Sequence, residues 1–480
     1  MNTMTFAELV GKLDSFAWGP VMLVLLVGTG VYLSIRVGFI QFSRLGYWMR
    51  NTFGKIFKKQ AAGSGEVTPL QAVTTALAAT VGTGNIAGVT GAIVAGGPGA
   101  VFWMWISALF GMVTKYAEVL LSVKYRERND HGDWVGGPMY YIKNGLGKGW
   151  AWLGSVFCVL GALAAFGIGN MTQINTIASS INTAIDAFGG NVEASSVLLF
   201  GQNVPVSSVV IGVVAAAIVA LVIIGGLKRI GQVTEKLVPV MAVIYILASI
   251  VVLIVNIRFL GQAFGLIFGN AFTVQAAFGG AVGVAFKTVV QKGVARGVFS
   301  NEAGLGSAPI AHAASSESNP VKQGMYGIFE VFMDTIVICT LTALVVLLGY
   351  CSGAIAPDWA GSGGTELVSG AFGGVFGSRI GSLIVAVGIT LFALSTLLSW
   401  SLYGVRCFEY LFGVRASMGY KIVFVLVVVI GATLKLSIVW DIADTLNGFM
   451  AIPNLIALLG LSGVVIQLTK EHFSNKDNLQ

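Results

Sequence analysis

Long apolar runs, separated by short polar segments, make up most of the chain. A helix needs about 20 apolar residues to cross a bilayer core, and the long runs number eleven. They cover about residues 16–36, 67–95, 98–123, 150–182, 205–226, 236–257, 270–298, 325–350, 380–410, 418–437 and 440–468. The pattern therefore predicts an all-α polytopic membrane protein with about eleven transmembrane helices.

Composition supports a membrane environment. Of the 480 residues, 56% are hydrophobic and only 10% are charged, and the mean hydropathy is +0.85, whereas soluble domains are about 25% charged. The 64 glycines suit closely packed membrane helices. The four cysteines form no CxxC pair, so neither a structural metal site nor a disulfide framework is expected.

Lys and Arg are concentrated in alternate loops. The segment after the first span carries Arg36, Arg44, Arg50, Lys55, Lys58 and Lys59, and the later loops assigned to the same side hold Lys124, Arg126, Lys228, Lys287, Lys292, Arg296, Lys322, Arg406 and Lys470 among others. The opposite loops carry only Lys12, Arg258, Arg379 and Lys435. By the positive-inside rule the N-terminus lies outside the cell (plasma or inner) membrane and the C-terminus lies in the cytoplasm. The net charge of +7 then reflects these loops, so we predict no nucleic-acid partner.

Two spans contain glycine clusters that interrupt a helix. If the first span (within 1–66) is set aside, ten remain as two sets of five, at 67–257 and 258–470, before a cytoplasmic tail at 471–480. The first span of each set is interrupted, by VGTGNIAG at 81–88 and by FGGAVG at 278–283. Matching interruptions in two halves indicate a transporter with inverted repeats. Close helix packing is the alternative explanation of these glycines.

An interrupted membrane helix has a specific chemical use. The second half of the helix exposes N–H groups, which suit a carboxylate, and the first half exposes carbonyl oxygens, which suit a small cation. Such a break can therefore hold an ion and a charged substrate without placing a full charge in lipid.

Several stretches resemble the alanine or glycine:cation symporter family. The segment GGPGAVFWMWISALFG at 96–111 is similar to the family signature, and GTGNIAGV at 82–89, GGPMYYI at 136–142 and SNEAGLGSAPIAHA at 300–313 support it. The resemblance implies a LeuT-type fold of the APC superfamily with one extra N-terminal helix. It also implies sodium-driven uptake of alanine or glycine, with sodium as the co-transported ion and no cofactor.

The resemblance also implies two sites. Sodium would meet the carbonyls of Ala78 and Val81 and the eighth core helix at Phe392, Ser395 and Thr396. The substrate would meet Thr80, Thr83, Gly84 and Asn85 at the first break, with the N–H groups of Thr83 and Gly84 facing its carboxylate. The side chains themselves add Gln173, whose amide could reach a charged group of the substrate, and Phe278, Gly279 and Trp400, which could wall its side-chain pocket. Asn85 stands where the neurotransmitter branch of the fold has a ligand of a further sodium.

The polar pattern of two spans agrees with these sites. Phe392, Ser395, Thr396, Ser399, Trp400 and Tyr403 share one helical face. Asn170, Thr172, Gln173 and Asn175 form an unusual group of polar residues in an apolar span. The alternatives are hydroxyls that bond to their own helix and amides that join helices.

Some charges also fall within spans. Lys115 and Glu118 are three residues apart and are predicted to pair, while Glu330 and Asp334 share a face. A structural or gating role is expected for them, and His312 is expected in a cytoplasmic loop, solvated or capping a helix.

Other functions remain as alternatives. A channel would need a continuous polar pore, and a membrane enzyme would need a catalytic set, for which three histidines offer little. Within the transporter class, coupling to protons in place of sodium and a glutamine-like substrate both stay open.

Overall fold

The computed structural model describes residues 6–55, 63, 66–199, 201–272, 286–356, 364–434 and 437–475. Its first half comprises α1 (Phe6–Ala17), α2 (Pro20–Arg36), α3 (Ile40–Ser43), α4 (Leu45–Asn51), η1 (Phe53–Lys55), α5 (Pro69–Thr80), η2 (Thr83–Asn85), α6 (Ala87–Gly96), α7 (Ala100–Lys124), β1 (Glu127–Arg128), β2 (Trp134–Val135), α8 (Pro138–Tyr141), η3 (Ile142–Leu146), η4 (Lys148–Trp150), α9 (Ala151–Phe166), η5 (Gly167–Met171), α10 (Thr172–Ala187), η6 (Val192–Ala194), β3 (Ser196–Leu199), β4 (Gln202–Pro205), α11 (Val206–Ile223) and α12 (Gly226–Val255).

The second half is also helical. It comprises η7 (Ile257–Phe259), α13 (Leu260–Asn270), α14 (Phe286–Asn301), α15 (Pro309–His312), α16 (Pro320–Val331), η8 (Phe332–Cys339), α17 (Thr340–Cys351), α18 (Gly364–Phe376), α19 (Ser378–Phe412), η9 (Val414–Ala416), α20 (Ser417–Thr433), α21 (Ser437–Gly460) and α22 (Ser462–Ser474). The strands form two short antiparallel hairpins, β1–β2 and β3–β4.

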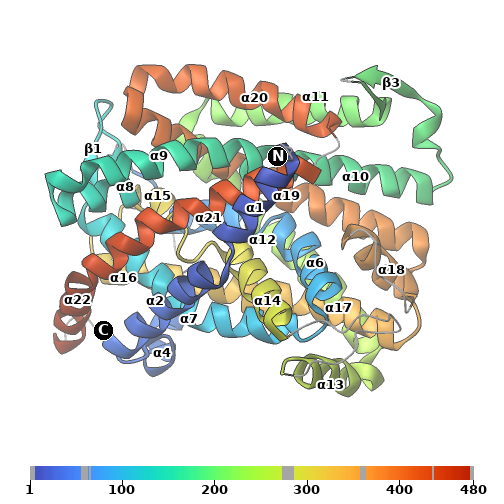
Figure 1. Cartoon of the computed structure of the whole chain (residues 1–480), viewed down its shortest axis with the longest axis horizontal. Coiled ribbons are helices and arrows are strands. Elements are labelled where there is room, and N and C mark those ends of the chain that lie inside the picture. Colours follow the sequence, from blue (N-terminus) through green and yellow to red (C-terminus); the bar gives the residue numbers. More distant parts are fainter. Residues whose placement is uncertain are drawn as a thin grey trace, which may run out of the picture.

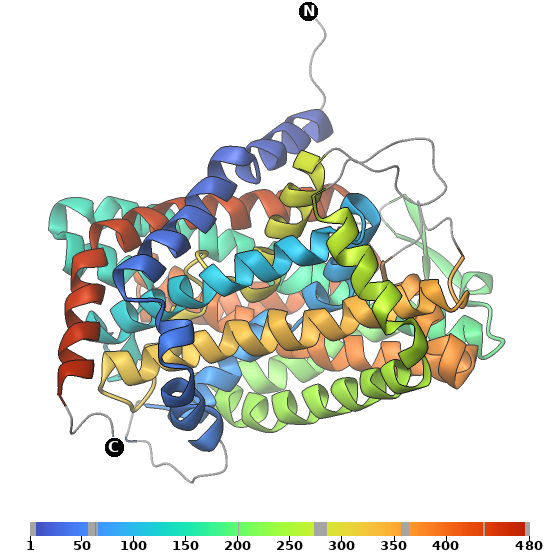
Figure 2. The same cartoon turned by 90° about the horizontal axis from the view of Figure 1, so that it is seen from below.

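The long helices run roughly along one axis and form a bundle (Figures 1 and 2). One end of the bundle carries β1, α8 and the C-terminal helix α22, and the other carries β3, α18 and α13 (Figure 1). Within the described residues, nine helices are long and apolar enough to span a membrane. The polytopic all-α architecture is thereby confirmed, and the count of eleven spans stays a prediction.

Two further helices are interrupted. The first consists of α5 and α6 with the short turn η2 between them, and the second consists of α14 and α15 with residues 302–308 between them. Helix α5 packs against α15 while α6 packs against α14, so the two interrupted helices run antiparallel. The start of the first is tied to the end of the second, because Val67 N donates to Ala314 O and Ser316 N donates to Val67 O.

The second interruption lies downstream of the predicted one. The glycines at 278–283, with Phe278 and Gly279, fall outside the described residues. Helix α14 continues to Asn301, three residues past the predicted end of the span, and the chain then turns with positive φ at Glu302, Gly304 and Gly306. Lys292 and Arg296, predicted in a cytoplasmic loop, therefore lie within α14 before the break. The stretch EAGLGSA was recognised only as a family motif, although its glycines supply the backbone angles that a sharp turn needs.

Local sequence explains where the first interrupted helix begins and stops. Thr68 and Gln71 form a reciprocal capping box, with Thr68 Oγ1 accepting from Gln71 N and Gln71 Oε1 accepting from Thr68 N, each at 3.1 Å, and Pro69 occupies the first turn. Helix α5 ends at Thr80, because the next residue, Val81, has non-helical backbone angles of φ −79° and ψ 84°. Gly82 and Gly84 follow it in the sequence.

The extra N-terminal helix is bent. Helices α1 and α2 meet at Trp18 and Gly19, with Pro20 in the first turn of α2. Helix α1 packs along α21, and α2 packs along α7 and touches α14. This helix therefore lies beside the second interrupted helix.

Candidate functional site

Residues 81–85 form a compact turn at the first break. Gly82 N donates to Asn85 Oδ1 at 2.8 Å, so the Asn85 side chain closes the turn from the inside. Thr80 remains part of α5, because its hydroxyl donates to the carbonyls of Ala76 and Leu77, at 3.3 Å each. The turn is buried throughout, and the hydrogen bond between Gly82 and Asn85 stabilises its conformation.

Two hydroxyls of α19 meet a carbonyl of α5 at this break. Ser395 Oγ lies 3.2 Å and Thr396 Oγ1 lies 3.0 Å from Ala78 O. Both hydroxyls also donate to Phe392 O, at 2.7 and 3.1 Å, so the expected alternative of bonding within the helix occurs alongside the contact to α5. A Cβ added to Gly82 would overlap Thr396 Oγ1. Val81, the other residue predicted to offer a carbonyl, directly precedes Gly82.

This cluster of oxygens fits a small hard cation. Ligand oxygens about 2.4 Å from such an ion lie about 3 to 3.5 Å from one another, and the oxygen separations at Ala78, Ser395 and Thr396 fall in this range. Ala78, Phe392, Ser395 and Thr396 are thus brought together as the resemblance implies, and no full charge is among them.

Gln173 joins the third core helix to the same turn. Its Oε1 accepts from Thr83 N at 3.3 Å, and its Nε2 donates to Ile168 O at 2.8 Å. In contrast, Asn170 and Asn175 donate to Phe424 O and Leu434 O and so join helices. Gln173 is the amide of this group that reaches the break.

Three buried hydroxyls, one in the turn of the first break and two on α19, have no hydrogen-bond partner among the described residues. They are Thr83 Oγ1, Ser399 Oγ and Tyr403 Oη. An unsatisfied buried polar group costs about 1–3 kcal/mol, which indicates a place for a polar ligand. Ser399 and Tyr403 share the face of α19 that holds Thr396, and this periodicity was the signal that could have added them to the predicted site.

Trp400 and Gly84 contact the second interrupted helix. Trp400 Nε1 donates to Glu302 Oε1 at 2.8 Å, and its ring base lies against Gly169, where an added Cβ would overlap it. A Cβ at Gly84 would lie 3.3 Å from both Phe299 Cδ1 and Ser300 Cα. The two breaks are therefore in direct contact.

Asp334 accepts hydrogen bonds from both interrupted helices. Asn85 Nδ2 donates to Asp334 Oδ1 at 2.6 Å, Ser300 Oγ donates to it at 3.2 Å, and Thr335 Oγ1 donates to Asp334 Oδ2 at 2.7 Å. Asp334 thus joins both interrupted helices to the π-helical segment η8, a role that its predicted position near the cytoplasmic end of a span did not suggest.

The second break is closed by a carboxylate of α7. Glu118 Oε1 accepts from Gly304 N and Gly306 N, at 3.1 Å each, and Asn454 Nδ2 donates both to Glu118 and to Gly304 O. Glu302 accepts from Ser307 Oγ as well as from Trp400. Protein groups therefore already occupy the freed backbone of this loop.

The predicted Lys115–Glu118 pair is wrong. Lys115 Nζ lies 3.2 Å from Glu330 Oε1 on α16, both side chains being fully buried, whereas Glu118 binds the second break. His312 is also fully buried and lies 3.2 Å from Glu330 Oε2, in place of the expected solvated loop. The i, i+3 spacing could not reveal Glu330, because that partner comes from another helix.

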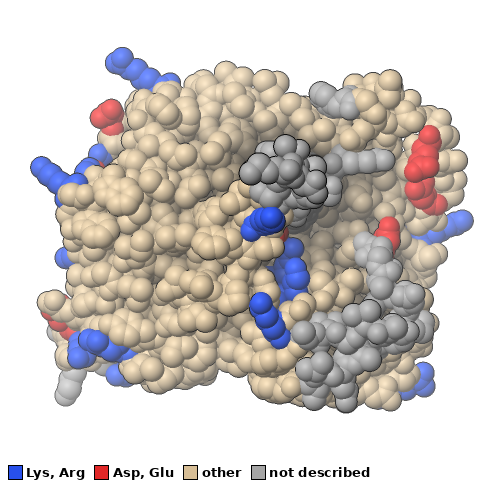
Figure 3. Space-filling model, in the orientation of Figure 1, with Lys and Arg blue, Asp and Glu red and all other residues tan. Residues whose placement is uncertain are grey.

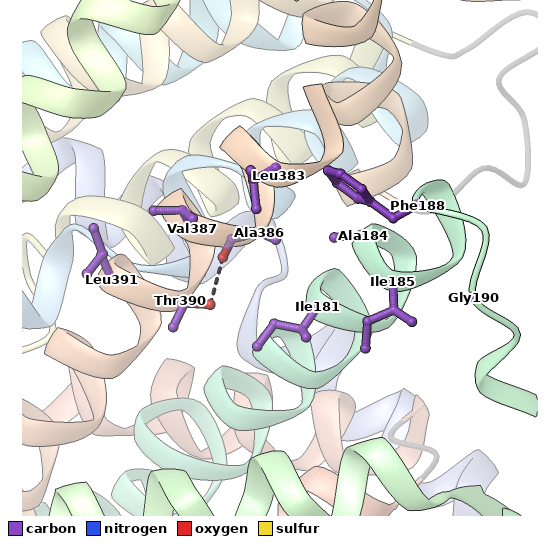
Figure 4. A pocket seen from close by; sticks show the side chains of 10 residues that line it. All are labelled: Ile181, Ala184, Ile185, Phe188, Gly190, Leu383, Ala386, Val387, Thr390 and Leu391. Atoms are coloured by element: carbon purple, nitrogen blue, oxygen red, sulfur yellow. Dashed lines mark hydrogen bonds between the residues drawn. The ribbon is translucent and has the colours of Figure 1, made fainter. Parts of the chain in front are cut away.

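A separate apolar pocket of about 610 Å³ lies between α10 and α19 (Figure 4). Its walls are apolar apart from Thr390, whose hydroxyl donates to Ala386 O at 2.6 Å. Because its lining carries no charge, it does not suit the two charged groups of an amino acid, and we assign the site to the breaks.

Antiparallel interrupted helices with oxygens gathered at their breaks define a cation-coupled amino-acid transporter of the LeuT fold. The solved structure of MhsT in complex with L-phenylalanine shares this fold, with a TM-score of 0.57 at 13% identity, over 85% of this chain and 99% of that chain. The chain belongs to the sodium:alanine symporter family, whose sequence profile matches residues 2–480.

Two relatives illustrate the range of the family. The sodium/alanine symporter AgcS of Methanococcus maripaludis is 48% identical over 97% of both chains. The probable sodium/glutamine symporter GlnT of Bacillus subtilis is 36% identical over 98% of this chain and 91% of its own. Family members are transporters, which excludes the enzyme alternative.

Proposed function

We propose that the protein takes up alanine and glycine together with sodium by alternating access. The observation that carries the proposal is the convergence of Ser395 Oγ and Thr396 Oγ1 on Ala78 O at the first break. These neutral oxygens suit sodium, and sodium would bind the carbonyl that the interruption of the helix makes available. Sodium in place of protons is favoured because this cluster contains no titratable group.

The substrate would lie beside the cation. Its carboxylate would face the backbone of Thr83 and Gly84, displacing the amide of Gln173, and the unpartnered hydroxyls of Thr83, Ser399 and Tyr403 would complete its polar contacts. Trp400 and Phe299 would leave room for a small side chain, which favours alanine and glycine over glutamine. The similarity to the alanine symporter AgcS supports the same choice.

Uptake of radiolabelled alanine into proteoliposomes tests the proposal. A sodium gradient should drive accumulation that choline does not support, and linkage requires sodium to tighten alanine binding by the factor by which alanine tightens sodium binding. Excess unlabelled glycine should compete, and glutamine should not. Equal alanine uptake in sodium and in choline would refute sodium coupling, and accumulation driven by a pH gradient alone would assign the coupling to protons.

A further inference from the structure

One face of α12 carries a shallow groove near the start of the helix. The groove has a volume of about 460 Å³, and its lining residues recur at helical spacing along this face, namely Arg229, Gln232, Val233, Lys236, Leu237 and Val240. The start of α12 and the turn between β1 and β2 line one neighbouring pocket. The groove therefore lies toward the end of the bundle that carries β1. Helix α12 itself runs along an edge of the bundle (Figure 2).

The groove lies where the charged part of α12 gives way to its apolar part. On the face of the molecule drawn in Figure 3, charged side chains are concentrated at the two ends of the bundle, with a smaller group of Lys and Arg near the centre. Helix α12 follows this division, because Lys236 is its last charged residue and residues 237–255 are all uncharged. Val240 is 54% exposed. Charged turns lie at the membrane–water interface and apolar turns lie in the hydrocarbon, so the groove extends from one into the other.

The two cations of the groove are not compensated by the protein. Arg229 and Lys236 are both exposed, and within the described part of the chain no carboxylate lies within ion-pair distance of either. Glu235 is used elsewhere, because its Oε2 accepts from Gln71 Nε2 of α5 at 3.0 Å. Arg229 and Lys236 stand two turns apart on one face, about 10.5 Å along the axis. Their long side chains can therefore reach one phosphate-sized anion between them.

We propose that this groove binds an anionic phospholipid. The lipid phosphate would lie between Arg229 and Lys236, and an acyl chain would follow Leu237 and Val240 into the apolar layer. A soluble anion would use only the cations and an uncharged lipid only the apolar turn, whereas an anionic lipid matches both. The volume equals that of about fifteen water molecules at about 30 Å³ each, which suffices for a phosphate group with its glycerol.

A different face of α12 supports the first break. Thr234 Oγ1 lies 3.1 Å from Thr75 Oγ1 on α5, and Met241 Sδ lies 3.5 Å from Ser395 Oγ on α19. A lipid in the groove would therefore stabilise a helix that packs against the candidate cation site. This role goes beyond the proposed function and does not depend on which solute is carried.

Protection of a cysteine placed in the groove tests the site. Gln232 is exposed and lines the groove, so the rate at which an uncharged maleimide labels Gln232→Cys reports its occupancy. The background carries Cys351→Ser, because Cys351 is partly exposed while the other three native thiols are buried. Labelling is measured in a neutral detergent with phosphatidylglycerol, phosphatidylcholine of the same chain length, or inorganic phosphate. Ser43→Cys, at an exposed position next to Arg44, reports the general effect of an anionic micelle.

Phosphatidylglycerol should slow the labelling of Gln232→Cys about tenfold at ten times its half-protecting concentration, and phosphatidylcholine and inorganic phosphate should not. Arg229→Gln and Lys236→Gln should each raise that concentration about fivefold, equivalent to about 1 kcal/mol, which is the contribution of one cation near an anionic membrane surface. Lys228→Gln removes the same charge from the same helix outside the groove lining. It should leave the concentration unchanged and is the matched control.

Several results would overturn the lipid site. Unchanged labelling of Gln232→Cys in phosphatidylglycerol would refute it outright, and equal protection by inorganic phosphate would assign the groove to a free anion. Equal protection by phosphatidylcholine would mean that acyl chains alone occupy the groove. Equal slowing at Ser43→Cys, or an equal effect of Lys228→Gln, would reduce the site to general surface charge. Protection that needs no lipid and increases with protein concentration would assign the groove to a second copy of the chain.

Discussion

Replacing Gly82 by alanine should weaken sodium binding while leaving the protein folded. An added Cβ would overlap Thr396 Oγ1, so this hydroxyl must leave its position 3.0 Å from Ala78 O. A hydrogen bond or ligand contact to a charged group contributes about 1.5–3 kcal/mol, which corresponds to a loss of about tenfold or more in apparent sodium affinity. Hydrogen bonds within membrane proteins average only about 0.6 kcal/mol, so the melting temperature should change little.

The assay is the sodium dependence of alanine uptake by Gly82→Ala in proteoliposomes, with the melting temperature of the same preparation. Gly88→Ala and Gly91→Ala are matched controls, because an added Cβ at either position of α6 meets nothing within 4 Å. A Gly82→Ala protein with wild-type sodium dependence would refute the assignment of Thr396 to the cation. A large loss of thermal stability with unchanged sodium dependence would identify Gly82 as a packing residue.

Three further results are expected. Thr396→Ala should lower apparent sodium affinity about tenfold while Thr396→Ser, which keeps the hydroxyl, should retain most of it; identical sodium titrations for the two variants would contradict the ligand role. Lys115→Met should destabilise the protein by about 3–5 kcal/mol, because it removes the lysine partner of the buried Glu330 carboxylate, and adding Glu330→Gln should recover most of the lost melting temperature; no recovery would mean that the lysine acts through packing alone. Burial, followed by the charge of a nearby lysine, lowers the pKa of His472 from 6.5 to about 4. The unfolded chain therefore binds the extra proton first, and stability is present above pH 6.5 and is lost as the pH falls toward 4. The melting temperature should drop across this window less in His472→Phe than in the wild type, and parallel curves would contradict the assignment.

Local sequence patterns were sufficient to predict the all-α membrane architecture and the position of the first break. The apolar runs predicted the membrane helices, and VGTGNIAG predicted the first break, because glycine and asparagine are poor helix formers wherever they stand. The face shared by Ser395 and Thr396 followed from the 3.6-residue repeat alone. Each of these features is local, so that a single segment contains the information.

The remaining features depend on contacts between segments. The glycines near 280 led to a predicted break there. Glu302 adopts positive φ although it is not glycine, so its residue type does not indicate the turn that follows α14. Lys115 was assigned to a neighbour on its own helix, although its partner Glu330 lies more than two hundred residues away in the sequence. His312 was predicted to be solvated or to cap a helix because it falls in a predicted cytoplasmic loop, and only tertiary packing reveals that it is buried. The spacing of charged residues along the sequence does not reveal which of them pair between distant helices.

The carboxylate that closes the second break makes the two halves of the transporter chemically unequal. Glu118 places an acid on the backbone N–H groups of Gly304 and Gly306, much as a bound amino acid would do at a helix interruption. A carboxylate of the protein thus satisfies the backbone N–H groups of the second break. At the first break the N–H groups of Gly82 and Thr83 are held by the neutral side chains of Asn85 and Gln173, so the two breaks differ in the charge of the group that satisfies their backbone.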